Sequence, residues 1–401
     1  MQQAYIINGV RTAVGNFGGT LAAVRTDDLA AFVIKELMER NKTVNFSEVG
    51  DVIFGCANQA GEDNRNVARM SSLLAGLPIT VPGVTVNRLC ASGLSATIDA
   101  ARAIQVGDEH LMISGGVENM TRGPLVMSKA SGAYGRDQQL FDSSFGWRFI
   151  NPKMKELFGV DSMGDTAENV AEKYKISKTD QDKFAFWSQQ KAAKAQSEGR
   201  FAKEIASISI PQKKGDPIQF ANDEFIKPKT TLEGLAGLKP SFKKDGSVTA
   251  GNASGLNDGA AALLIASEQG IKTNNLKPLA RIVSSAVVGV EPRIMGIGPV
   301  EAANKALKRA GLTFKDIDII ELNEAFAAQS LACTRAWGLA DNDERINPNG
   351  GAIAIGHPLG MTGARILLSA ALQLNITNKK YALVTLCIGV GQGYAAVIER
   401  A

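Results

Sequence analysis

The sequence predicts an α/β fold made of two similar halves with a region inserted between them. Short apolar runs typical of buried strands alternate with helix-period segments along most of the 401 residues. Two stretches of the chain repeat the same order of features, and a more polar stretch separates them. We therefore assign residues 1–118 with 250–270 to an N-terminal half, 119–249 to an inserted loop domain and 271–401 to a C-terminal half.

The repeated elements follow one order in both halves. A helix pattern, at 26–40 or 300–312, precedes a first apolar strand; a small-residue helix and a second apolar strand come later. The expected strands cover 51–56 and 110–118 in the first half, and 317–326 and 381–389 in the second.

The repeat also relates individual residues of the two halves. Phe46 and Phe314 stand at the same place before the first strand. Cys90 lies 90 − 46 = 44 residues after its Phe, and His357 lies 357 − 314 = 43 residues after its own; a glycine follows each three residues later. We expect a pseudo-twofold axis between the halves that brings Cys90 and His357 together.

The inserted region contains a helix of its own. Ser177 and Asp180 have the spacing of a capping box, an apolar face follows them, and Gly199 is placed as a C-terminal glycine cap. We expect this region to cover the active site.

Composition and charge exclude several classes of protein. The chain has 44 Lys+Arg and 40 Asp+Glu, and 45% of its residues are apolar, which excludes a disordered, collagen-like or coiled-coil chain. The chain lacks the dense basic run that would predict binding to nucleic acid or to an anionic membrane. No apolar stretch reaches the length of a membrane span.

The four cysteines lie far apart and form no CxxC pair, which argues against a disulfide framework and a tetrathiolate zinc site. No His, Cys and carboxylate spacing suits a metal. The N-terminus lacks the profile of a secretion signal. We therefore expect reduced thiols, no metal and a cytoplasmic protein.

Cys90 is the candidate nucleophile. It follows a β-rich run and begins a helix, whose N-terminus is expected to lower the pKa of the thiol and favour the thiolate. The alternative is a small buried filler, which is also the expected role of Cys56 and Cys333.

His357 is the candidate general base. It lies among glycines at a loop-to-helix turn with few bulky side chains, where an imidazole is accessible. The other histidine, His110, begins an apolar strand and is expected to be structural.

Cys387 lies at a strand end before a glycine loop, where backbone N–H groups can bind a developing oxyanion. A dinucleotide site would need a helix after these glycines, but an apolar strand follows them. No P-loop string occurs either.

Four blocks, "NRLCASG", "NEAFAAQ", "GGAIAIGHPLGMTGAR" and "CIGVGQG", occur in this order, with "TAGNASGLNDGAAAL" as a fifth. In these blocks, and from end to end, the chain resembles the thiolase family. The resemblance implies a five-layer αβαβα core, and CoA with a 3-oxoacyl-CoA as substrates. It also implies no permanently bound cofactor, and a homotetramer built as a dimer of dimers.

The resemblance also implies the catalytic roles. Cys90 accepts the acyl group, His357 activates it, and Cys387 is the acid and base at the substrate α-carbon. Asn323 holds a catalytic water that forms one oxyanion site with His357. The backbone N–H groups of Cys90 and Gly389 form the other.

The same resemblance implies six CoA contacts: Ser254, Ala250, Phe242, Met163, Phe326 and Lys227. The alternative for Lys227 is a solvated surface lysine. Biosynthetic acetoacetyl-CoA members have a histidine before the Met-Gly pair, where this chain has Ser162. Binding of pantetheine by a histidine at this position is therefore excluded.

Two further blocks, "GCANQAGEDNRNVARM" and "GWRFINPKMKELFGVDSM", together with Val390, are similar to members of the family that act on 3-oxoadipyl-CoA. Such a substrate ends in a carboxylate, which needs a cation or several donors. Arg65, Arg69 and Arg148 are the candidates, and each could instead stabilise a loop or an interface. Gly164-Asp165 replaces the Pro-Glu usual in this group, so the shape of the acyl pocket stays open.

Alternatives remain at this point. Within the family, the chain could be an acetoacetyl-CoA or general 3-oxoacyl-CoA enzyme. A ketoacyl synthase could share the duplicated fold, but it would not need Cys387. A non-catalytic acyl-CoA binding protein would not need Cys90, His357 and Asn323 together.

Overall fold

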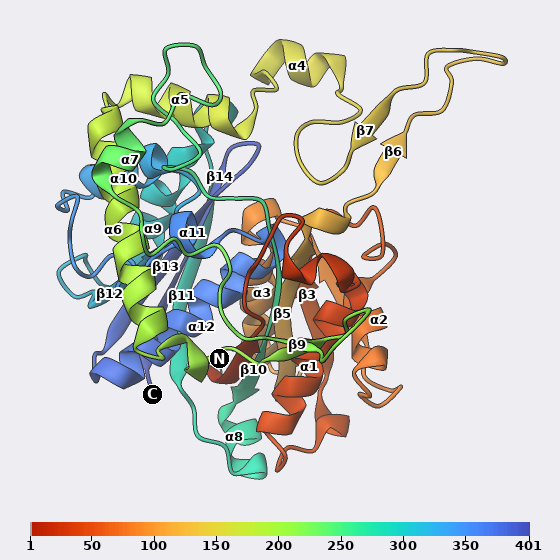
Figure 1. Cartoon of the computed structure of the whole chain (residues 1–401). Helices are drawn as coiled ribbons and strands as arrows, with labels where there is room; N and C mark the ends of the chain where they lie inside the picture. Colours follow the sequence, from red (N-terminus) through yellow and green to blue (C-terminus); the bar gives the residue numbers. More distant parts are fainter. Residues whose placement is uncertain (1) are drawn as a thin grey trace.

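The computed structural model describes residues 2–401 and contains one large mixed sheet with helices on its faces (Figure 1). The N-terminal half contains β1 (Ala4–Arg11), β2 (Gly15–Asn16), α1 (Thr26–Arg40), β3 (Asp51–Gly55), α2 (Val67–Leu74), β4 (Gly83–Val86), α3 (Ser92–Val106), β5 (Leu111–Asn119), β10 (Asn257–Ser267) and α8 (Glu268–Asn274). The C-terminal half contains β11 (Ala280–Gly289), α9 (Gly298–Ala310), β12 (Ile319–Leu322), α10 (Ala327–Ala336), α11 (Ala352–Ile355), α12 (Leu359–Thr377), β13 (Tyr381–Ile388) and β14 (Gln392–Arg400).

The sheet repeats one strand pattern. In the N-terminal half the order is β4-β3-β5-β10-β1, and in the C-terminal half it is β12-β13-β14-β11. The strands farthest from the junction of the halves pair in parallel: β4 with β3, β3 with β5, and β12 with β13. The two pairings nearest the junction are antiparallel in each half: β5–β10 and β10–β1, and β13–β14 and β14–β11. The position of β4 is taken in the C-terminal half by an isolated parallel bridge between Ile320 and Ile346. The halves meet where β1 and β11 pair antiparallel, at Tyr5 with Arg281 and at Ile6 with Ala280.

A matching irregularity confirms the duplication. The register of β1 against β10 shifts between Ile6 and Asn8, and the register of β11 against β14 shifts between Ile282 and Ser284. Strands β1 and β11 therefore each have one extra residue, two positions after Tyr5 and Arg281, where the halves join.

The helices form three layers around the two halves of the sheet. Helices α3 and α12 lie between them, and α12 contacts strands of both halves, including β5, β10, β12 and β13. Helices α1 and α2 cover the outer face of the N-terminal half, and α9 covers that of the C-terminal half. The arrangement is the expected five-layer αβαβα core. No helix among residues 2–401 is long and apolar enough to span a bilayer.

The central helices cross where neither has a side chain at the contact. A Cβ on Gly93 would lie 2.9 Å from the backbone nitrogen of Ala364, and one on Gly363 would lie 2.3 Å from that of Leu94. This reciprocity makes Gly93 the counterpart of Gly363, three residues beyond the expected Gly360. The expected equivalence of Cys90 and His357 in the repeat was therefore wrong by three residues, because the residue equivalent to Cys90 is Gly360.

The inserted region extends from the end of β5 to the start of β10. It contains β6 (Leu125–Met127), β7 (Leu140–Asp142), α4 (Pro152–Phe158), α5 (Met163–Lys173), α6 (Lys178–Ser197), β8 (Ile208–Ile210), β9 (Ile218–Phe220) and α7 (Leu232–Ala236). Figure 1 shows the β6–β7 hairpin projecting from the body, while α5 and α6 pack on α10 and α11 of the C-terminal half.

Helix α6 begins at the expected cap. The Ser177 hydroxyl accepts a hydrogen bond from the backbone N–H of Asp180, at 3.1 Å. The Asp180 carboxylate does not complete a capping box, because it pairs instead with Arg335 at 2.9 Å. The chain leaves the helix through Gly199, at φ +71°.

A buried ionic cluster joins the insertion to β1. The fully buried Arg11 guanidinium contacts Glu204 at 2.7 Å and Asp223 at 2.7 and 2.9 Å. Arg200 adds a contact to Glu204 at 3.1 Å, and the Ser369 hydroxyl donates to the same carboxylate. Every charge in this cluster has a partner of opposite sign, which is what allows it to be buried.

Candidate active site

Cys90 lies in a single helical turn (Leu89–Ala91) between β4 and the central helix α3. Leu89, the residue before it, has φ +46°, a left-handed backbone conformation that is rare for leucine. The backbone N–H groups of Gly389 and of Cys90 itself lie near the sulfur and lower its pKa, but burial outweighs them and raises the pKa to about 11. The expected lowering by the helix N-terminus does not prevail, so the resting thiol keeps its proton.

His357 lies between α11 and the N-terminus of α12 and is buried. Its Nδ1 is 2.8 Å from Oγ1 of Thr362, and that hydroxyl donates its hydrogen to the Pro358 carbonyl at 2.8 Å. Thr362 can therefore only accept from the imidazole, which places the ring proton on Nδ1 and leaves a lone pair on Nε2.

The His357 imidazole is neutral at rest. Burial lowers its pKa to about 3, and the buried Arg365 guanidinium adds to this effect. The backbone N–H of His357 donates to Oδ1 of Asn257 at 2.9 Å, which holds the loop in place. Both His357 and Cys90 are therefore neutral at rest, and a thiol needs a base to become a nucleophile.

Asn323 follows the end of β12 and faces His357. Its Nδ2 lies 3.4 Å from the imidazole Nε2, and its backbone N–H donates to the Thr385 carbonyl. Its Oδ1 is buried and has no hydrogen-bond partner within residues 2–401. An unsatisfied amide oxygen beside a catalytic base is a suitable position for a bound water.

Cys387 is the last residue but one of strand β13 and lies close enough to Cys90 for the two thiols to influence each other. Burial raises the pKa of Cys387 well above its ordinary value, and the neighbouring Cys90 raises it further. The turn after it has φ +63° at Val390 and +84° at Gly391, which leaves Gly389 between the strand and the turn. A Cβ on Gly389 would lie 3.1 Å from Leu89 and 3.6 Å from the Met163 sulfur.

Three residues with clear roles here were not singled out in the sequence. Thr362 orients the imidazole, and Asn257 holds its backbone. Glu118, fully buried at the end of β5, accepts the backbone N–H groups of Ala57, Asn58 and Gly360. Burial raises the Glu118 pKa to about 7. Their signal was present, because each lies inside a glycine-rich block at a strand end or helix start.

Four of the expected CoA contacts gather beside Cys387. The rings of Phe242 and Phe326 meet edge to face at 6.2 Å, and Phe326 belongs to the apolar cluster that contains Cys387. Ser254 donates its N–H to the carbonyl of Ala325 at 3.0 Å, next to Phe326. Met163 begins α5 and approaches Gly389. These residues form an apolar wall with one hydroxyl.

The other two lie further out. Ala250 is exposed, in the turn before Ser254. Lys227 is exposed, and its Nζ lies 4.9 Å from the centre of the Phe225 ring. The Phe225 ring packs against Gly255, because a Cβ on that glycine would lie 2.6 Å from the ring. Lys227 is therefore connected to the Ser254 segment through one aromatic ring.

The remaining cysteines and His110 have structural surroundings. Cys333 donates to the Gly296 carbonyl at 3.4 Å, and Nδ1 of His110 lies 2.8 Å from the Ser267 hydroxyl. Donor atoms of Cys56, Asp63 and Glu118 lie within 4.8 Å of one another. The Glu118 oxygens there are already occupied by backbone N–H groups, so this cluster is explained by loop structure.

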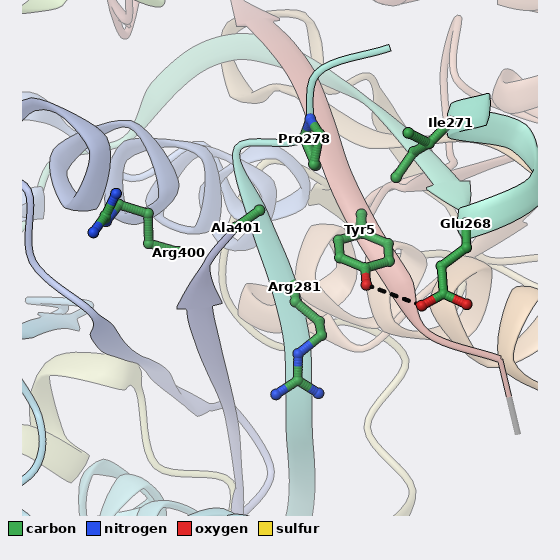
Figure 2. Close-up of a pocket in the computed structure, with 7 residues that line it drawn as sticks. All are labelled: Tyr5, Glu268, Ile271, Pro278, Arg281, Arg400 and Ala401. Atoms are coloured by element: carbon green, nitrogen blue, oxygen red, sulfur yellow. Dashed lines mark hydrogen bonds between the residues drawn. The ribbon is translucent and has the colours of Figure 1, made fainter. Parts of the chain in front are cut away.

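A cavity of about 430 Å³ opens far from these residues (Figure 2). Tyr5 and Arg281 line it, and the Tyr5 hydroxyl donates to Glu268 at 3.3 Å. Arg281 is paired with Glu399. None of the expected site residues lines this cavity, and its polar groups are already satisfied, so it is not the catalytic site.

Comparison with known proteins agrees with the fold. The sequence profiles of "Thiolase, N-terminal domain" and "Thiolase, C-terminal domain" match residues 4–269 and 276–400. A beta-ketoadipyl-CoA thiolase of Acinetobacter baylyi is 60% identical over 400 residues, and a 3-oxoadipyl-CoA/3-oxo-5,6-dehydrosuberyl-CoA thiolase of Escherichia coli K12 is 58% identical; both alignments cover 100% of each chain. The crystal structure of the Bacillus anthracis acetyl-CoA acetyltransferase superposes with a TM-score of 0.92 at 40% identity, covering 100% of this chain and 99% of that one.

Proposed function

Because the chain belongs to the thiolase family, and is therefore an acyltransferase, we propose that it cleaves 3-oxoadipyl-CoA with CoA to succinyl-CoA and acetyl-CoA. The observation that carries the proposal is a buried thiol, Cys90, close to a second thiol, Cys387, in a site with a neutral imidazole, His357. Breaking and making a carbon–carbon bond next to a thioester requires a nucleophile, a base and a separate acid at carbon.

The first step uses the neutral pair. The Nε2 lone pair of His357 takes the thiol proton of Cys90, and the sulfur attacks the 3-oxo carbon. The backbone N–H groups of Cys90 and Gly389, both near the sulfur, stabilise the oxyanion of the adduct.

Cleavage of the C2–C3 bond leaves a succinyl thioester on Cys90 and the enolate of acetyl-CoA. The enolate oxygen is bound by His357, which now has its proton on Nε2, and by a water on the unpartnered Oδ1 of Asn323. The Cys387 thiol protonates C2 of the enolate, and its raised pKa keeps that proton available at neutral pH. Acetyl-CoA then leaves.

CoA next enters as co-substrate, and no permanently bound cofactor or metal has a part in the scheme. Its thiol gives up a proton to the thiolate of Cys387 and attacks the succinyl thioester, which releases Cys90 as a thiolate. This thiolate takes back its proton from His357, and the site returns to its starting state. The pantetheine arm would lie along Met163, Phe326 and Phe242, with Ser254 and Ala250 beyond them. Lys227 would face the phosphates of the nucleotide at the outer end.

The choice of 3-oxoadipyl-CoA follows the relatives rather than the catalytic groups. Relatives named for beta-ketoadipyl-CoA or 3-oxoadipyl-CoA are 58–60% identical over their full length, while the acetyl-CoA acetyltransferase of known structure is 40% identical. An enzyme with this substrate would serve the breakdown of aromatic acids. An acetoacetyl-CoA or general 3-oxoacyl-CoA enzyme is the second candidate, since both would use the same catalytic residues.

We also propose a homotetramer, arranged as a dimer of dimers, in the cytoplasm. Strand β4 is an edge of the sheet with Val84 41% exposed, and the projecting hairpin exposes Leu125, Met127 and Leu140. Open strand edges and clustered apolar side chains are typical of subunit interfaces. All four cysteines are free thiols, as suits a reducing compartment. Light scattering on the purified protein gives the oligomeric state directly.

The substrate proposal is tested by measuring CoA-dependent cleavage of 3-oxoadipyl-CoA and acetoacetyl-CoA, with Cys90→Ala as the blank. A much higher kcat/KM for 3-oxoadipyl-CoA is expected. An equal or higher value for acetoacetyl-CoA would assign the chain to the general enzymes. Folded protein that cleaves neither substrate would refute catalysis itself.

A further inference from the structure

The proposed substrate brings a charge that the catalytic groups do not neutralise. The acyl chain of 3-oxoadipyl-CoA ends in a carboxylate, which stays at the far end of the succinyl group on Cys90. Burying a carboxylate without a partner is costly, so a donor or cation is required near the acyl chain. This requirement rests on the proposed function, because only a dicarboxylic acyl chain carries the second charge.

Two of the three candidate arginines are not suited to it. Arg69 donates from Nη2 to the Ile79 carbonyl at 2.8 Å and from Nη1 to the Val81 carbonyl. Its guanidinium therefore stabilises the loop between α2 and β4. Arg65 is exposed, with φ +63°, two residues before α2 begins. An exposed arginine loses little by staying in water and offers a weak site for a carboxylate.

Arg148 differs from both. It lies in the inserted region after β7, is half-buried, and forms no ion pair within residues 2–401. Nη1 donates to the Ser143 carbonyl at 3.1 Å, while Nη2 has only Oδ1 of Asn58, at 3.5 Å. That second distance is at the limit of a hydrogen bond, so part of the guanidinium fork has no good acceptor. A fork with free N–H groups is the geometry that binds a carboxylate.

The contacts of Asn58 connect Arg148 to the catalytic segments. The backbone N–H of Asn58 donates to Glu118, which also accepts the N–H of Gly360 at 2.9 Å, at the start of the helix behind His357. On the other side, Asn87 donates to the Ala57 carbonyl at 2.9 Å and accepts the N–H of Leu89 at 2.9 Å. The residue that contacts Arg148 is thus next to the loops that carry both catalytic groups.

Arg88, two residues before Cys90, is the nearest competitor in the sequence. Its Nε donates to the Ser95 hydroxyl at 2.8 Å, its Nη1 donates to Gln392 at 3.1 Å, and its guanidinium stacks on Tyr394. These contacts occupy it on the side of α3 and leave it no role toward the substrate.

We propose that Arg148 binds the terminal carboxylate of the acyl chain and makes the enzyme selective for a dicarboxylic 3-oxoacyl-CoA. The Ser143 carbonyl holds Nη1 of the guanidinium in position at 3.1 Å, and Asn58, whose Nδ2 donates to the Ser143 hydroxyl at 3.2 Å, lies beside Nη2. Selectivity then comes from one charge-assisted pair in the inserted region, separate from the groups that do the chemistry.

The test compares 3-oxoadipyl-CoA with 3-oxohexanoyl-CoA, which has the same acyl length and no terminal charge. For Arg148→Gln we expect the ratio of the two kcat/KM values to fall about 10- to 100-fold, the range for a hydrogen-bonded charge pair. Arg148→Lys should recover part of the ratio, because it restores the charge without the fork. Arg136→Gln, at an exposed position of the projecting hairpin, is the matched control and should leave the ratio as in the wild type.

The outcomes separate this inference from the proposed function. A wild-type preference for 3-oxoadipyl-CoA that survives in Arg148→Gln would overturn the role of Arg148 and leave the function standing. A fall of both kcat/KM values by the same factor would also overturn it, because it would show a structural role. A wild type without preference for 3-oxoadipyl-CoA would contradict the proposed function itself.

Discussion

The two halves of the molecule have the same frame and different chemistry. At corresponding places at the start of the central helices, Ser92 and Thr362 each stand one residue before the glycine of the helix crossing. The Ser92 hydroxyl accepts the backbone N–H of Arg88 at 2.9 Å and donates to the Leu89 carbonyl. The Thr362 hydroxyl donates to the Pro358 carbonyl but accepts from the catalytic imidazole of His357.

The ends of strands β3 and β12, which are equivalent in the repeat, show the same contrast. Gly55 and Asn323 each stand nine residues after the paired phenylalanines, since 55 − 46 = 9 and 323 − 314 = 9. A Cβ on Gly55 would lie 2.3 Å from the backbone of Ser92, so the end of β3 packs directly against the start of α3. Asn323 instead faces His357 with an amide. The duplication places Gly55 and Asn323 at equivalent positions, but only Asn323 presents an amide to His357.

Removing the nucleophile of the N-terminal half gives the largest expected effect. Cys90→Ala should lower kcat by more than about 10⁴-fold, because no other group can hold the acyl chain. Cleavage of 3-oxoadipyl-CoA and mass spectrometry of the acyl-enzyme measure this. Cys56→Ala is the matched control. An acylated Cys90→Ala protein would place the nucleophile elsewhere.

Asn323→Ala removes the amide that distinguishes the C-terminal strand from its counterpart. Losing one oxyanion donor costs about 2.7 to 4 kcal/mol in the barrier, so kcat should fall about 10²- to 10³-fold with little change in KM. Steady-state kinetics on the same substrate measure it. A large rise in KM at unchanged kcat would contradict a role in transition-state stabilisation.

Replacing Thr362 tests a hydroxyl that each half has at the equivalent position. Thr362→Val leaves the Nδ1–H of His357 buried without an acceptor, and kcat/KM should fall about 10- to 100-fold. Thr362→Ser, which copies the residue at the corresponding place in the other half, should restore most of the activity and the pH profile of the wild type. If valine and serine act alike, the tautomer is set by another group.

Glu321 tests a buried position at which the two halves differ in polarity. It stands seven residues after its phenylalanine, as Ile53 does in the other half, and burial raises its pKa to about 8. In the folded state the carboxyl keeps its proton up to that pH, while the unfolded chain releases it near 4.5. Stability should therefore fall between pH 4.5 and 8, by up to about 1.4 kcal/mol per pH unit.

Glu321→Gln should make this pH dependence weaker. Melting temperatures of wild type and variant at pH 5.5 and 8.5 measure it, and Glu39→Gln, exposed on α1, serves as the control. An equal loss of stability in wild type and Glu321→Gln would show that other groups cause the pH dependence.

Much of the arrangement was predictable because its signals are local. The strand runs, the glycine blocks and the repeated spacing indicated both halves. The five residues named for chemistry lie at strand ends and helix starts: Cys90 is near Gly389 and Cys387, and His357 is near Asn323. The error of three residues arose because "GHPLGMTG" contains two glycines that could meet Gly93. Only the close approach of α3 and α12 decides between them.

The pKa of Cys90 was not predictable in the same way. The sequence places the thiol at a helix start, which lowers the pKa, but burial depends on residues distant in the chain that cover the site. The role of Thr362 likewise depends on which way its hydroxyl hydrogen points, and this follows from the position of the Pro358 carbonyl.

The buried contact of Arg11 with Glu204 and Asp223 also determines how the molecule comes apart. Arg11 belongs to the first strand, while both carboxylates belong to the insertion, and the backbone of Arg11 pairs with Glu204 and Ala206 on the same stretch. Lifting the insertion would leave a guanidinium buried without its partners, which is strongly unfavourable. The insertion and the sheet beneath it therefore form a single cooperative unit, and amides in both should exchange hydrogen through the same opening event.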